Sequence, residues 1–580
     1  MTSAPPRISE RIYRTRRFGW VDLIIVIALA GLLYGVLQLG REWRGAARPA
    51  IAIDLSPWAL PRYTLYSLSR GLLAYALSLS FTLVYGYWAA KDRVAERVLV
   101  PLLDILQSIP VLGFMPGLIL ALVALFPHSN TGLELAAVIM IFTGQAWNMT
   151  FSYYHSLRSV PVDMREVGSV YRFSWWQQLK WIELPYATIG LVWNSMLSMA
   201  GGWFFLMINE AFRLGDRDFR LPGIGSYMSV AVDEGRMDAM LWAVGAMTLM
   251  IVAVDQVLWR PVVVWAQKFR TEEGGQQERM TSWFLHWLRR SRLLLVLRLV
   301  WRRARTRWQR RRSPSPSPTG RPTIERPPAG RPAAWLGVVL LTLLVAVLLF
   351  GAWKLTHILR RVPAGEWGTL TGAAGWTLGR VLLATALGTL WALPAGIAIG
   401  LSPRLSRILQ PVVQIVASFP APMLFPIVIA GLAAAGVSLG WGSIVLMLLG
   451  TQWYILFNVI AGAMAIPADL QEAARSYRLR GWRRFRALYL PGVFPYLVTG
   501  WVTAAGGAWN ASIVAEFVTF KGRTLQAHGL GAQISAAAAA ADFPKLAASI
   551  LVMSAIVVVF NRTVWRRCYQ FAERRFSLNK

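Results

Sequence analysis

Cysteine and histidine are scarce in this chain of 580 residues, which contains one cysteine and five histidines. The single cysteine, Cys568, has no second cysteine to pair with inside the chain, so cysteine usage does not indicate a redox compartment. The sequence has no His/Cys cluster with metal-ligand spacing, no Gly-x-Ser-x-Gly nucleophile turn and no paired-carboxylate site. It also lacks the Gly-x-x-x-x-Gly-Lys-Ser/Thr loop that cradles phosphate. We therefore predict a chain that is not an enzyme and that binds no metal and no cofactor itself.

Acidic residues are also few, with 28 Asp and Glu against 60 Lys and Arg, which gives a formal net charge of +32. Such an excess usually suggests a nucleic-acid partner, but here the basic residues lie in short segments between long apolar runs. We therefore expect this charge at a membrane surface beside lipid headgroups, and we predict no nucleic-acid partner.

The longest of these basic segments covers residues 263–332. Within it, residues 283–312 interleave Trp and Leu with Arg, a pattern typical of a helix lying in the inner membrane interface. Residues 313–332 are rich in Ser and Pro, which favours an extended tether. We predict that this linker joins a first domain, residues 1–262, to a second domain, residues 333–580.

Apolar residues are abundant, at 56% of the chain, and the mean hydropathy is +0.45. This composition predicts an all-α polytopic membrane protein, because runs of about 20 apolar residues cross the hydrocarbon core as helices. The first run has basic residues before it, but it is long and no small-residue cleavage site clearly follows, so we expect an uncleaved anchor. Twelve spans are predicted, near residues 19–40, 66–90, 98–126, 134–157, 186–210, 239–262, 333–354, 376–400, 408–433, 440–464, 492–515 and 546–561.

The second half of the chain repeats the first. A shift of 306 residues places Trp147 on Trp453, Pro161 on Pro467, Trp203 on Trp509, Glu210 on Glu516, Gly223 on Gly529 and Gly225 on Gly531. Upstream the shift is 310 residues and pairs Arg70 with Arg380, Pro110 with Pro420 and Pro116 with Pro426. The difference predicts a four-residue insertion in the first half between Pro116 and Trp147. Register held over this length indicates an internal duplication.

The basic segments before residue 19, at 91–97, 158–180, 263–332, 404–407 and 475–486, and after 561 all fall on one side of the predicted topology. By the positive-inside rule that side is the cytoplasm, and both termini lie there. Each half has an even number of spans, so both halves insert the same way up. The predicted fold is thus two parallel six-helix repeats with a pseudo-two-fold axis along the membrane normal.

A doubled signature occupies corresponding inner loops. The first copy contains Glu166, Val167, Gly168 and Arg172 and ends in Ile182-x-Leu184-Pro185; the second contains Glu472, Ala473, Ala474 and Arg478 and ends in Leu490-Pro491. The pattern resembles the glutamate-alanine-alanine loop of the membrane subunits of ABC importers. This resemblance implies that each loop forms a short cytoplasmic coupling helix that docks on an ATPase subunit.

Both copies carry arginine, Arg172 and Arg478, where the family pattern has glycine. Arginine tolerates a positive φ poorly, so we predict a continuous helix or a shifted turn at these two positions. The small residues of the motif are expected to allow close approach of the partner.

The sequence around the loops is most similar to that of permeases of the nitrate, sulfonate, taurine and bicarbonate group. This similarity implies uptake of a small oxyanion into the cell across its inner membrane by alternating access, with an external solute-binding protein. It also implies two cytoplasmic ABC ATPase subunits that supply ATP and Mg²⁺ chemistry. An ion-coupled secondary transporter with two six-helix halves is the alternative, because twelve parallel-repeat spans suit that architecture too.

Repeated polar groups in or near the spans are the candidates for the translocation path: Arg70, Arg380, Trp203, Trp509, Glu210 and Glu516. Two arginines related by symmetry at one entrance would favour an anion, whereas the alternative is that they extend to the outer headgroups. The two glutamates could instead be structural salt-bridge partners. Asp104 and Asp255 have no acidic counterparts in the other half, so we do not predict them as ligands.

Overall fold

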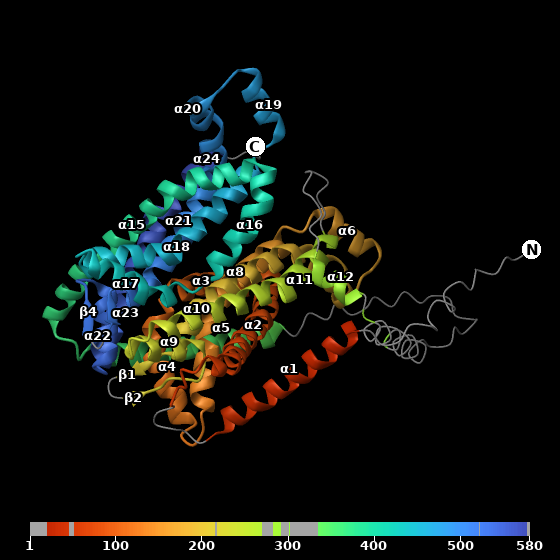
Figure 1. The fold of residues 1–580 in the computed structure, drawn as a ribbon. Helices are drawn as coiled ribbons and strands as arrows, with labels where there is room; N and C mark the ends of the chain where they lie inside the picture. Colours follow the sequence, from red (N-terminus) through yellow and green to blue (C-terminus); the bar gives the residue numbers. More distant parts are fainter. Residues whose placement is uncertain are drawn as a thin grey trace, which may run out of the picture.

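The computed structural model describes residues 20–45, 52–214, 217–269, 282–289, 291, 301, 334–520 and 523–576. These residues form helices and two short β-hairpins (Figure 1). Of the predicted interfacial helix at 283–312, helix α12 (Trp283–Arg289) is described, and most of the rest, like the tether at 313–332, lies outside the described residues.

The elements of the first half follow one another in this order: α1 (Trp20–Arg44), η1 (Pro57–Ala59), α2 (Leu60–Lys91), α3 (Arg93–Ser108), α4 (Val111–Leu125), α5 (Thr131–Arg158), α6 (Val162–Val170), α7 (Trp175–Gln178), η2 (Leu179–Glu183), α8 (Leu184–Glu210), β1 (Arg213–Leu214), β2 (Arg217–Asp218), α9 (Ile224–Asp233), α10 (Met237–Val254), η3 (Asp255–Trp259), α11 (Arg260–Ala266) and η4 (Gln267–Phe269). Strands β1 and β2 pair antiparallel, with Arg213 opposite Asp218.

The second half gives nearly the same order: α14 (Ala334–Leu359), α15 (Ala364–Leu401), α16 (Pro403–Ser418), η5 (Ala421–Leu424), α17 (Phe425–Ala434), α18 (Leu439–Met464), α19 (Ala468–Ser476), α20 (Gly481–Arg484), η6 (Phe485–Tyr489), α21 (Leu490–Ala515), β3 (Phe517–Phe520), β4 (Arg523–Gln526), α22 (Leu530–Ala539), α23 (Phe543–Phe560), η7 (Asn561–Trp565) and α24 (Arg566–Phe576). Helix starts from α6 onward recur 306 residues later, and those of α3 and α4 recur 310 residues later. The extra residues of the first half lie at the end of α4, in the α4–α5 turn and at the start of α5.

Seven helices of the described residues are long and apolar enough to cross a membrane, or nine if each of two bent helix pairs is one span. Helices α1, α5 and α21, which cover three other predicted windows, have 25, 28 and 26 residues. The domain boundary predicted at residue 262 falls inside α11. The count of twelve therefore stays a prediction.

Two predicted spans are not straight helices. The window at 98–126 is divided into α3 and α4, which are bent by 96°, and the window at 408–433 is divided into α16 and η5–α17, bent by 78°. The cause is a proline at each break, Pro110 and Pro420, because proline keeps the preceding residue out of the helical region. Ile109 and Phe419 accordingly have ψ angles of 124° and 129°. Continuous apolarity in the sequence concealed these breaks.

The two halves pack against each other through these broken segments. Helices α3 and α4 contact α23, and α4 also contacts α21, while α16 contacts α8 and α10 and η5 contacts α8. At one such contact the Asn510 side chain of α21 accepts a hydrogen bond of 2.8 Å from the backbone N–H of Val111, the first residue of α4. The largest cluster of buried apolar side chains contains residues of both halves, so the core is continuous between them.

A fully buried arginine ties four elements of the first half together. The Arg70 guanidinium donates to both carboxylate oxygens of Glu134 at 2.6 Å, to Glu210 at 2.7 Å and to the carbonyl of Pro222 at 2.9 Å. All three charged side chains have no exposed surface. Glu210 also accepts from the Ser67 hydroxyl and the N–H of Gly225. A buried charge is tolerated when it is paired in this way.

The second half repeats this cluster with one carboxylate fewer. Arg380 donates to Glu516 at 2.7 Å and to the carbonyl of His528 at 2.7 Å, and Thr377 takes the place of Ser67. The position of Glu134 is occupied by Gly440, whose carbonyl accepts from Arg380 at 3.0 Å. The first cluster thus has one net negative charge among these groups, and the second is neutral.

Glycines allow the loop before α9 and α22 to lie directly on each glutamate. A Cβ atom at Gly223 would lie 2.3 Å from the Glu210 carboxylate, and a Cβ atom at Gly529 would lie 2.2 Å from that of Glu516. Both distances are far below van der Waals contact, so these two positions require glycine. The glycine pairs of the repeat are explained by this close approach.

We predict that Glu516→Gln destabilises the protein more than Glu210→Gln does. After Glu516→Gln no described carboxylate pairs with Arg380, which has 8% of its surface exposed, and an uncompensated buried charge costs about 3–5 kcal/mol. After Glu210→Gln, Arg70 keeps Glu134, and the loss is limited to weaker hydrogen bonds, about 1 kcal/mol. Thermal unfolding in detergent measures the difference; equal midpoints for the two variants would contradict it.

Candidate functional site

The doubled signature forms two loops of the same construction. The first loop, residues 162–183, contains α6, α7 and η2, and the second loop, residues 468–489, contains α19, α20 and η6. Each leading helix follows a proline with extended backbone, Pro161 or Pro467, and has an aspartate in its first turn, which favours a helix N-terminus. Figure 1 places α6 and α19–α20 off the helix bundle, away from β1–β2 and α22.

The turn after each leading helix is formed by the arginine itself. Arg172 and Arg478 both have φ of 51°, so the predicted continuous helix or shifted turn is wrong. The N–H of Phe173 donates to the carbonyl of Gly168 at 2.8 Å, and that of Leu479 donates to Ala474 at 2.9 Å. With the accompanying bonds from Arg172 to Ser169 and from Arg478 to Arg475, this is a Schellman ending. The two bonds and the returning chain offset the strain of a left-handed arginine, which is of the order of 1–2 kcal/mol.

The small residues of the motif serve two purposes. Gly168 and Ala474 are buried inside their loops, and a Cβ atom at Gly168 would lie 3.1 Å from Cδ1 of Ile182 on the returning segment. Their small size therefore lets each loop close on itself, which the sequence did not predict. Val167 and Ala473, one residue earlier, are exposed, as are Glu166 and Glu472. The exposed acid and its neighbour are the part of the motif that a partner can reach.

The prolines of the motif begin the next long helices. Pro185 and Pro491 occupy the first turn of α8 and α21. Leu184 and Leu490 beside them are half-buried. The five residues before each of these leucines form a π-helical turn. Within the first such turn, Glu183 is buried and pairs with Lys91 of α2, a contact with no acidic counterpart in the second loop.

The residues predicted for the translocation path do not gather in one place. Arg70 with Glu210, and Arg380 with Glu516, form the separate buried clusters described above, at the ends of α8 and α21 away from the loops. Their pairing is the salt-bridge alternative noted for the glutamates, and their part in translocation stays a prediction. Glu134, which the sequence analysis missed, had no signal in the repeat because its counterpart is Gly440. Trp203 and Trp509 are buried at 2% and 3% exposure.

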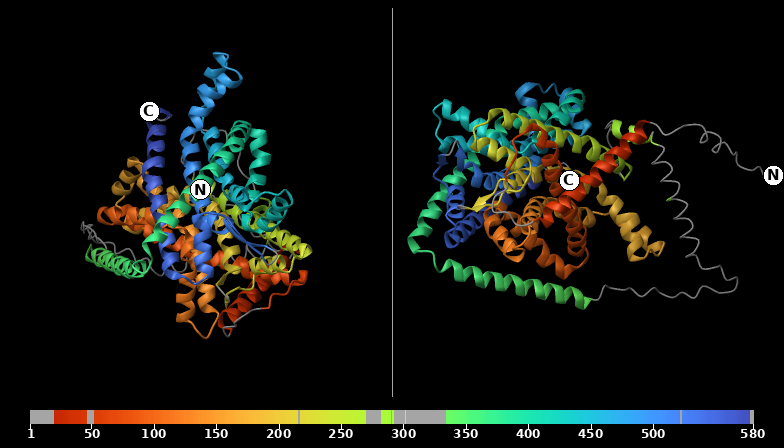
Figure 2. Two further views of the ribbon diagram at one scale, coloured as in Figure 1. Left: turned by 90° about the vertical axis from the view of Figure 1, so that its left-hand side faces the viewer. Right: turned by 60° about the horizontal axis from the view of Figure 1, so that its bottom comes forward.

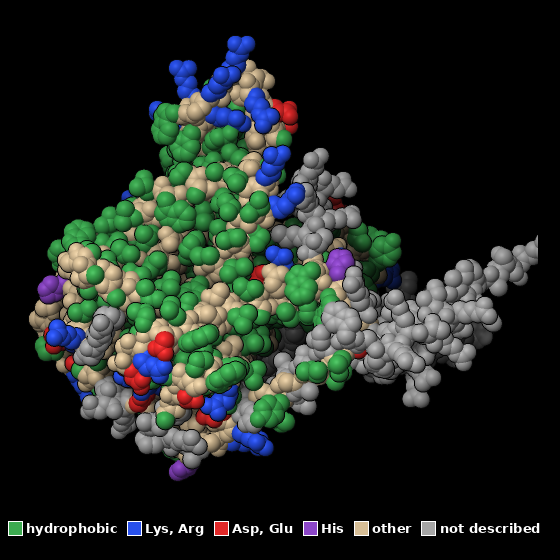
Figure 3. All heavy atoms as spheres, in the orientation of Figure 1, with side chains coloured by type: hydrophobic (Ala, Val, Ile, Leu, Met, Phe, Trp, Pro, Cys, Tyr) green, Lys and Arg blue, Asp and Glu red, His purple; other side chains and the backbone are tan. Residues whose placement is uncertain are grey.

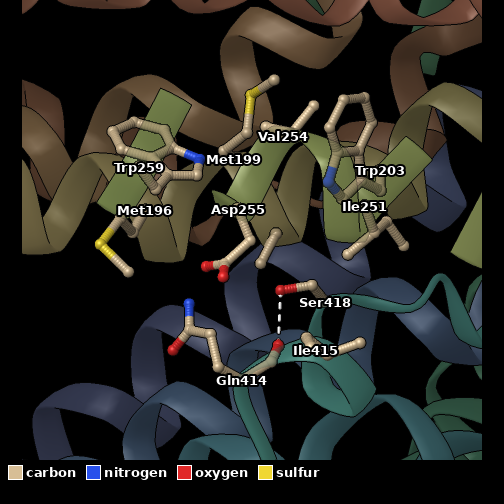
Figure 4. A pocket seen from close by; sticks show the side chains of 11 residues that line it. Met196, Met199, Trp203, Ile251, Val254, Asp255, Trp259, Gln414, Ile415 and Ser418 are labelled. Atoms are coloured by element: carbon tan, nitrogen blue, oxygen red, sulfur yellow. Dashed lines mark hydrogen bonds between the residues drawn. The ribbon is translucent and has the colours of Figure 1, made fainter. Parts of the chain in front are cut away.

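Trp203 lines a small pocket between the two halves (Figure 4). The pocket has about 10 Å³ for the centre of a water-sized sphere, which is room for about one water molecule. The Asp255 carboxylate and the Gln414 amide point toward each other across it (Figure 4). Asp255 Oδ2 accepts from Gln256 at 3.0 Å and lies 3.7 Å from Nε of Arg260. The lining residues are Met196, Met199, Ala200, Trp203, Ile251, Val254, Asp255, Trp259, Gln414, Ile415 and Ser418.

The acid and the amide of this pocket exchange places in the repeat. Asp255 corresponds to Asn561 at the 306-residue shift, and Gln414 corresponds to Asp104 at the 310-residue shift. The residues that correspond to the acid and the amide of the pocket are therefore an amide, Asn561, and an acid, Asp104. Two copies of the first half would instead bring two carboxylates together, which is unfavourable in apolar surroundings.

For the turns, we predict that Arg478→Gly keeps the second loop intact, because glycine adopts the left-handed conformation without strain. Arg478→Val is expected to unwind the end of α19, since a β-branched residue fits that conformation poorly and loses about 1–2 kcal/mol or more. Hydrogen exchange of residues 474–480 in detergent measures the change. Arg475→Val, in the helical part of the same loop, is the control; equal protection in the two valine variants would refute the prediction.

For the pocket, we predict that Gln414→Glu weakens the contact between the halves, because a second carboxylate would face Asp255. Two carboxylates in one site resist ionisation together, at a cost of about 1–3 kcal/mol. The loss should appear as a lower thermal midpoint and should shrink at acidic pH, where a proton neutralises one of them. Gln410→Glu, about one turn earlier in α16 and outside the pocket, is the control. A midpoint as high as that of the control at every pH would show that the two groups do not interact.

Comparison with known proteins identifies several relatives. Over 148 residues the chain is 30% identical to the nitrate import permease protein NrtB of Leptolyngbya laminosa, covering 25% of this chain and 52% of the relative. It is 29% identical over 167 residues to the bicarbonate transport system permease protein CmpB of Synechocystis sp., covering 28% and 58%. It is 28% identical over 145 residues to the taurine transport system permease protein TauC of Escherichia coli, covering 24% and 50%. The chain thus spans about half the length of these relatives.

The model of one protein family matches the chain twice, at residues 82–258 and 388–576, which together are more than half of it. The two matches include the two loops at corresponding positions, in agreement with the duplication seen in the sequence. The family describes a membrane component and not a catalytic subunit. The chain therefore belongs to the family of binding-protein-dependent transport system inner membrane components.

Proposed function

We propose that this chain is the complete membrane channel of an ATP-driven ABC importer, with two fused permease halves in place of two subunits. The observation that carries the proposal is the pair of loops at 162–183 and 468–489. They share helix bounds, a left-handed arginine and a terminal proline at a constant shift of 306 residues. We propose that each loop docks on one cytoplasmic ABC ATPase subunit and that an external solute-binding protein delivers the solute.

The proposed topology has twelve spans in two parallel repeats, with both termini in the cytoplasm and a pseudo-two-fold axis along the membrane normal. The reciprocal contacts support it, since α3–α4 meets α23 while α16 meets α10. The basic side chains around the loops support a cytoplasmic location for this end of the bundle.

The proposed mechanism is alternating access. Closure of the ATPase pair on ATP moves both loops, and the halves rock about their contact so that the central path opens to one side at a time. We propose that the path passes the Asp255–Gln414 pocket, which has room for about one water molecule. Differential affinity of the ATPases for the two states drives the cycle.

The proposed solute is a small oxyanion such as nitrate, a sulfonate or bicarbonate. The similar permeases named for nitrate, bicarbonate and taurine support this class. An ion-coupled secondary transporter receives no support from the family that the chain belongs to.

We predict that Glu166→Ala combined with Glu472→Ala lowers both ATPase co-purification and solute uptake at least tenfold, since both acids are exposed at the proposed docking surface. Tenfold corresponds to about 1.4 kcal/mol, in the range of one or two lost charge-assisted hydrogen bonds. Asp163→Ala with Asp469→Ala removes the same charge from the same helices and is the control. Unchanged co-purification and uptake in the glutamate variant would reject the docking role.

A further inference from the structure

The two loops differ in charge although their backbones correspond. The first loop has Asp163, Glu166 and Glu183 against Arg165, Arg172 and Lys180, so its formal charge is zero. The second loop has Asp469 and Glu472 against Arg475, Arg478, Arg480, Arg483, Arg484 and Arg486, an excess of four positive charges. Four of these arginines replace Ser169, Ser174, Gln177 and Gln178. Of the six, Arg484 is half-buried over the Tyr489 ring, and the other five are exposed.

The apolar surface differs in the opposite direction. In the first loop the exposed large apolar side chains are Val162, Val167, Val170, Tyr171, Trp175, Trp176 and Trp181. In the second loop they are Leu470, Tyr477 and Trp482. The first loop therefore presents an apolar surface, and the second presents a basic one.

A pocket beside the first loop adds to this contrast. Its volume is about 320 Å³, and its lining includes Val167, Trp181, Tyr186 and Phe269. At the 306-residue shift these four positions are Ala473, Ala487, Gly492 and Arg575 in the second half. The second half thus lacks the aromatic walls of this pocket and has an arginine in place of one of them. An apolar side chain of a partner fits the first site and not the second.

We propose, on the basis of the proposed function, that the two loops dock on two different ATPase polypeptides. The first loop and its pocket receive an apolar side chain of one ATPase, and the second loop binds an acidic groove of the other. The charge excess at the second loop makes that contact electrostatic, so it forms fast and weakens with salt. Two identical ATPase subunits would present the same docking surface to one apolar loop and one basic loop.

The position of the basic side chains favours a protein partner over lipid headgroups. Figure 3 shows Lys and Arg gathered at the tip of the projection formed by α19 and α20, beyond the apolar side chains that cover the bundle. Lipid headgroups would contact the protein where its apolar surface ends, which is at the base of this projection. Arg478, which forms the left-handed turn after α19, is exposed.

The test is site-specific photocrosslinking in the native complex, purified from cells that produce the chain with its own partners. A benzophenone amino acid is placed at Val170 in the first loop and at Ser476 in the second, which correspond and are both exposed. The expected result is a crosslink from each position to a different ATPase polypeptide, with acidic residues around the crosslinked site at 476.

Three other results have distinct meanings. Crosslinks from both positions to one polypeptide would overturn the inference of two ATPases and leave the importer function standing. Crosslinks from 476 to lipid alone would show that the basic surface binds headgroups and would overturn the acidic groove. The absence of any ATPase at either position would overturn the proposed function itself, and the inference with it.

Charge variants give a second, independent measurement. Arg475→Glu is expected to release the second ATPase at least tenfold more readily than wild type while the first is retained, and 0.5 M salt should do the same to the unmodified complex. Ser169→Glu, at the corresponding position of the first loop, introduces the same carboxylate and is the control. Equal retention of both ATPases in the Arg475→Glu variant and in high salt would refute the electrostatic contact.

Discussion

The structure depends on the pairing of charge in surroundings that cannot solvate it. Among the described residues, Arg70 and Arg380 are the two buried arginines, and each pairs with a glutamate at the end of a long helix. Through one guanidinium the first cluster joins α2, α5, α8 and the loop before α9. An arginine without its carboxylate would leave an uncompensated charge in an apolar core, at a cost of about 3–5 kcal/mol, which is a large share of the net stability of a typical fold. The glycines, the hydroxyl groups and the short hairpins of this region are arranged around that requirement.

Much of the fold could be predicted from the sequence because long apolar runs have few structural solutions. Helices cover the predicted windows, and the doubled loops lie at the positions that the repeat gave them. The breaks at Pro110 and Pro420 were not predicted, although the prolines were visible, because uninterrupted apolarity resembles one straight span. The backbone conformation of the two arginines was predicted wrongly, because the prediction used only the poor tolerance of arginine for a positive φ and took no account of the surrounding contacts. Two hydrogen bonds and a returning chain outweighed it at Arg172 and Arg478.

Residues of the candidate site could be predicted where both copies of the repeat contain them. Residues present in only one copy were harder to predict. Glu210 and Glu516 were recognised because they correspond, whereas Glu134 was missed because its counterpart is Gly440, whose carbonyl replaces it. Asp255 was set aside for lack of an acidic counterpart, yet it faces Gln414, which itself corresponds to the other unmatched acid, Asp104. Comparison of positions within one half could not reveal this exchange, because the pocket is formed by both halves.

Helix starts from α6 onward recur at one constant shift in the second half, whereas the formal charges of the two loops differ by four. The helices of the two halves pack against each other (Figures 1 and 2). One contact between the halves limits how they can move. The first amide of α4, at Val111, is satisfied by Asn510 of the opposite half. If the halves separated there, the amide would face hydrocarbon without a partner, at a cost of several kcal/mol. In the proposed alternating access we therefore expect this contact to stay closed, so that the two halves rotate about it.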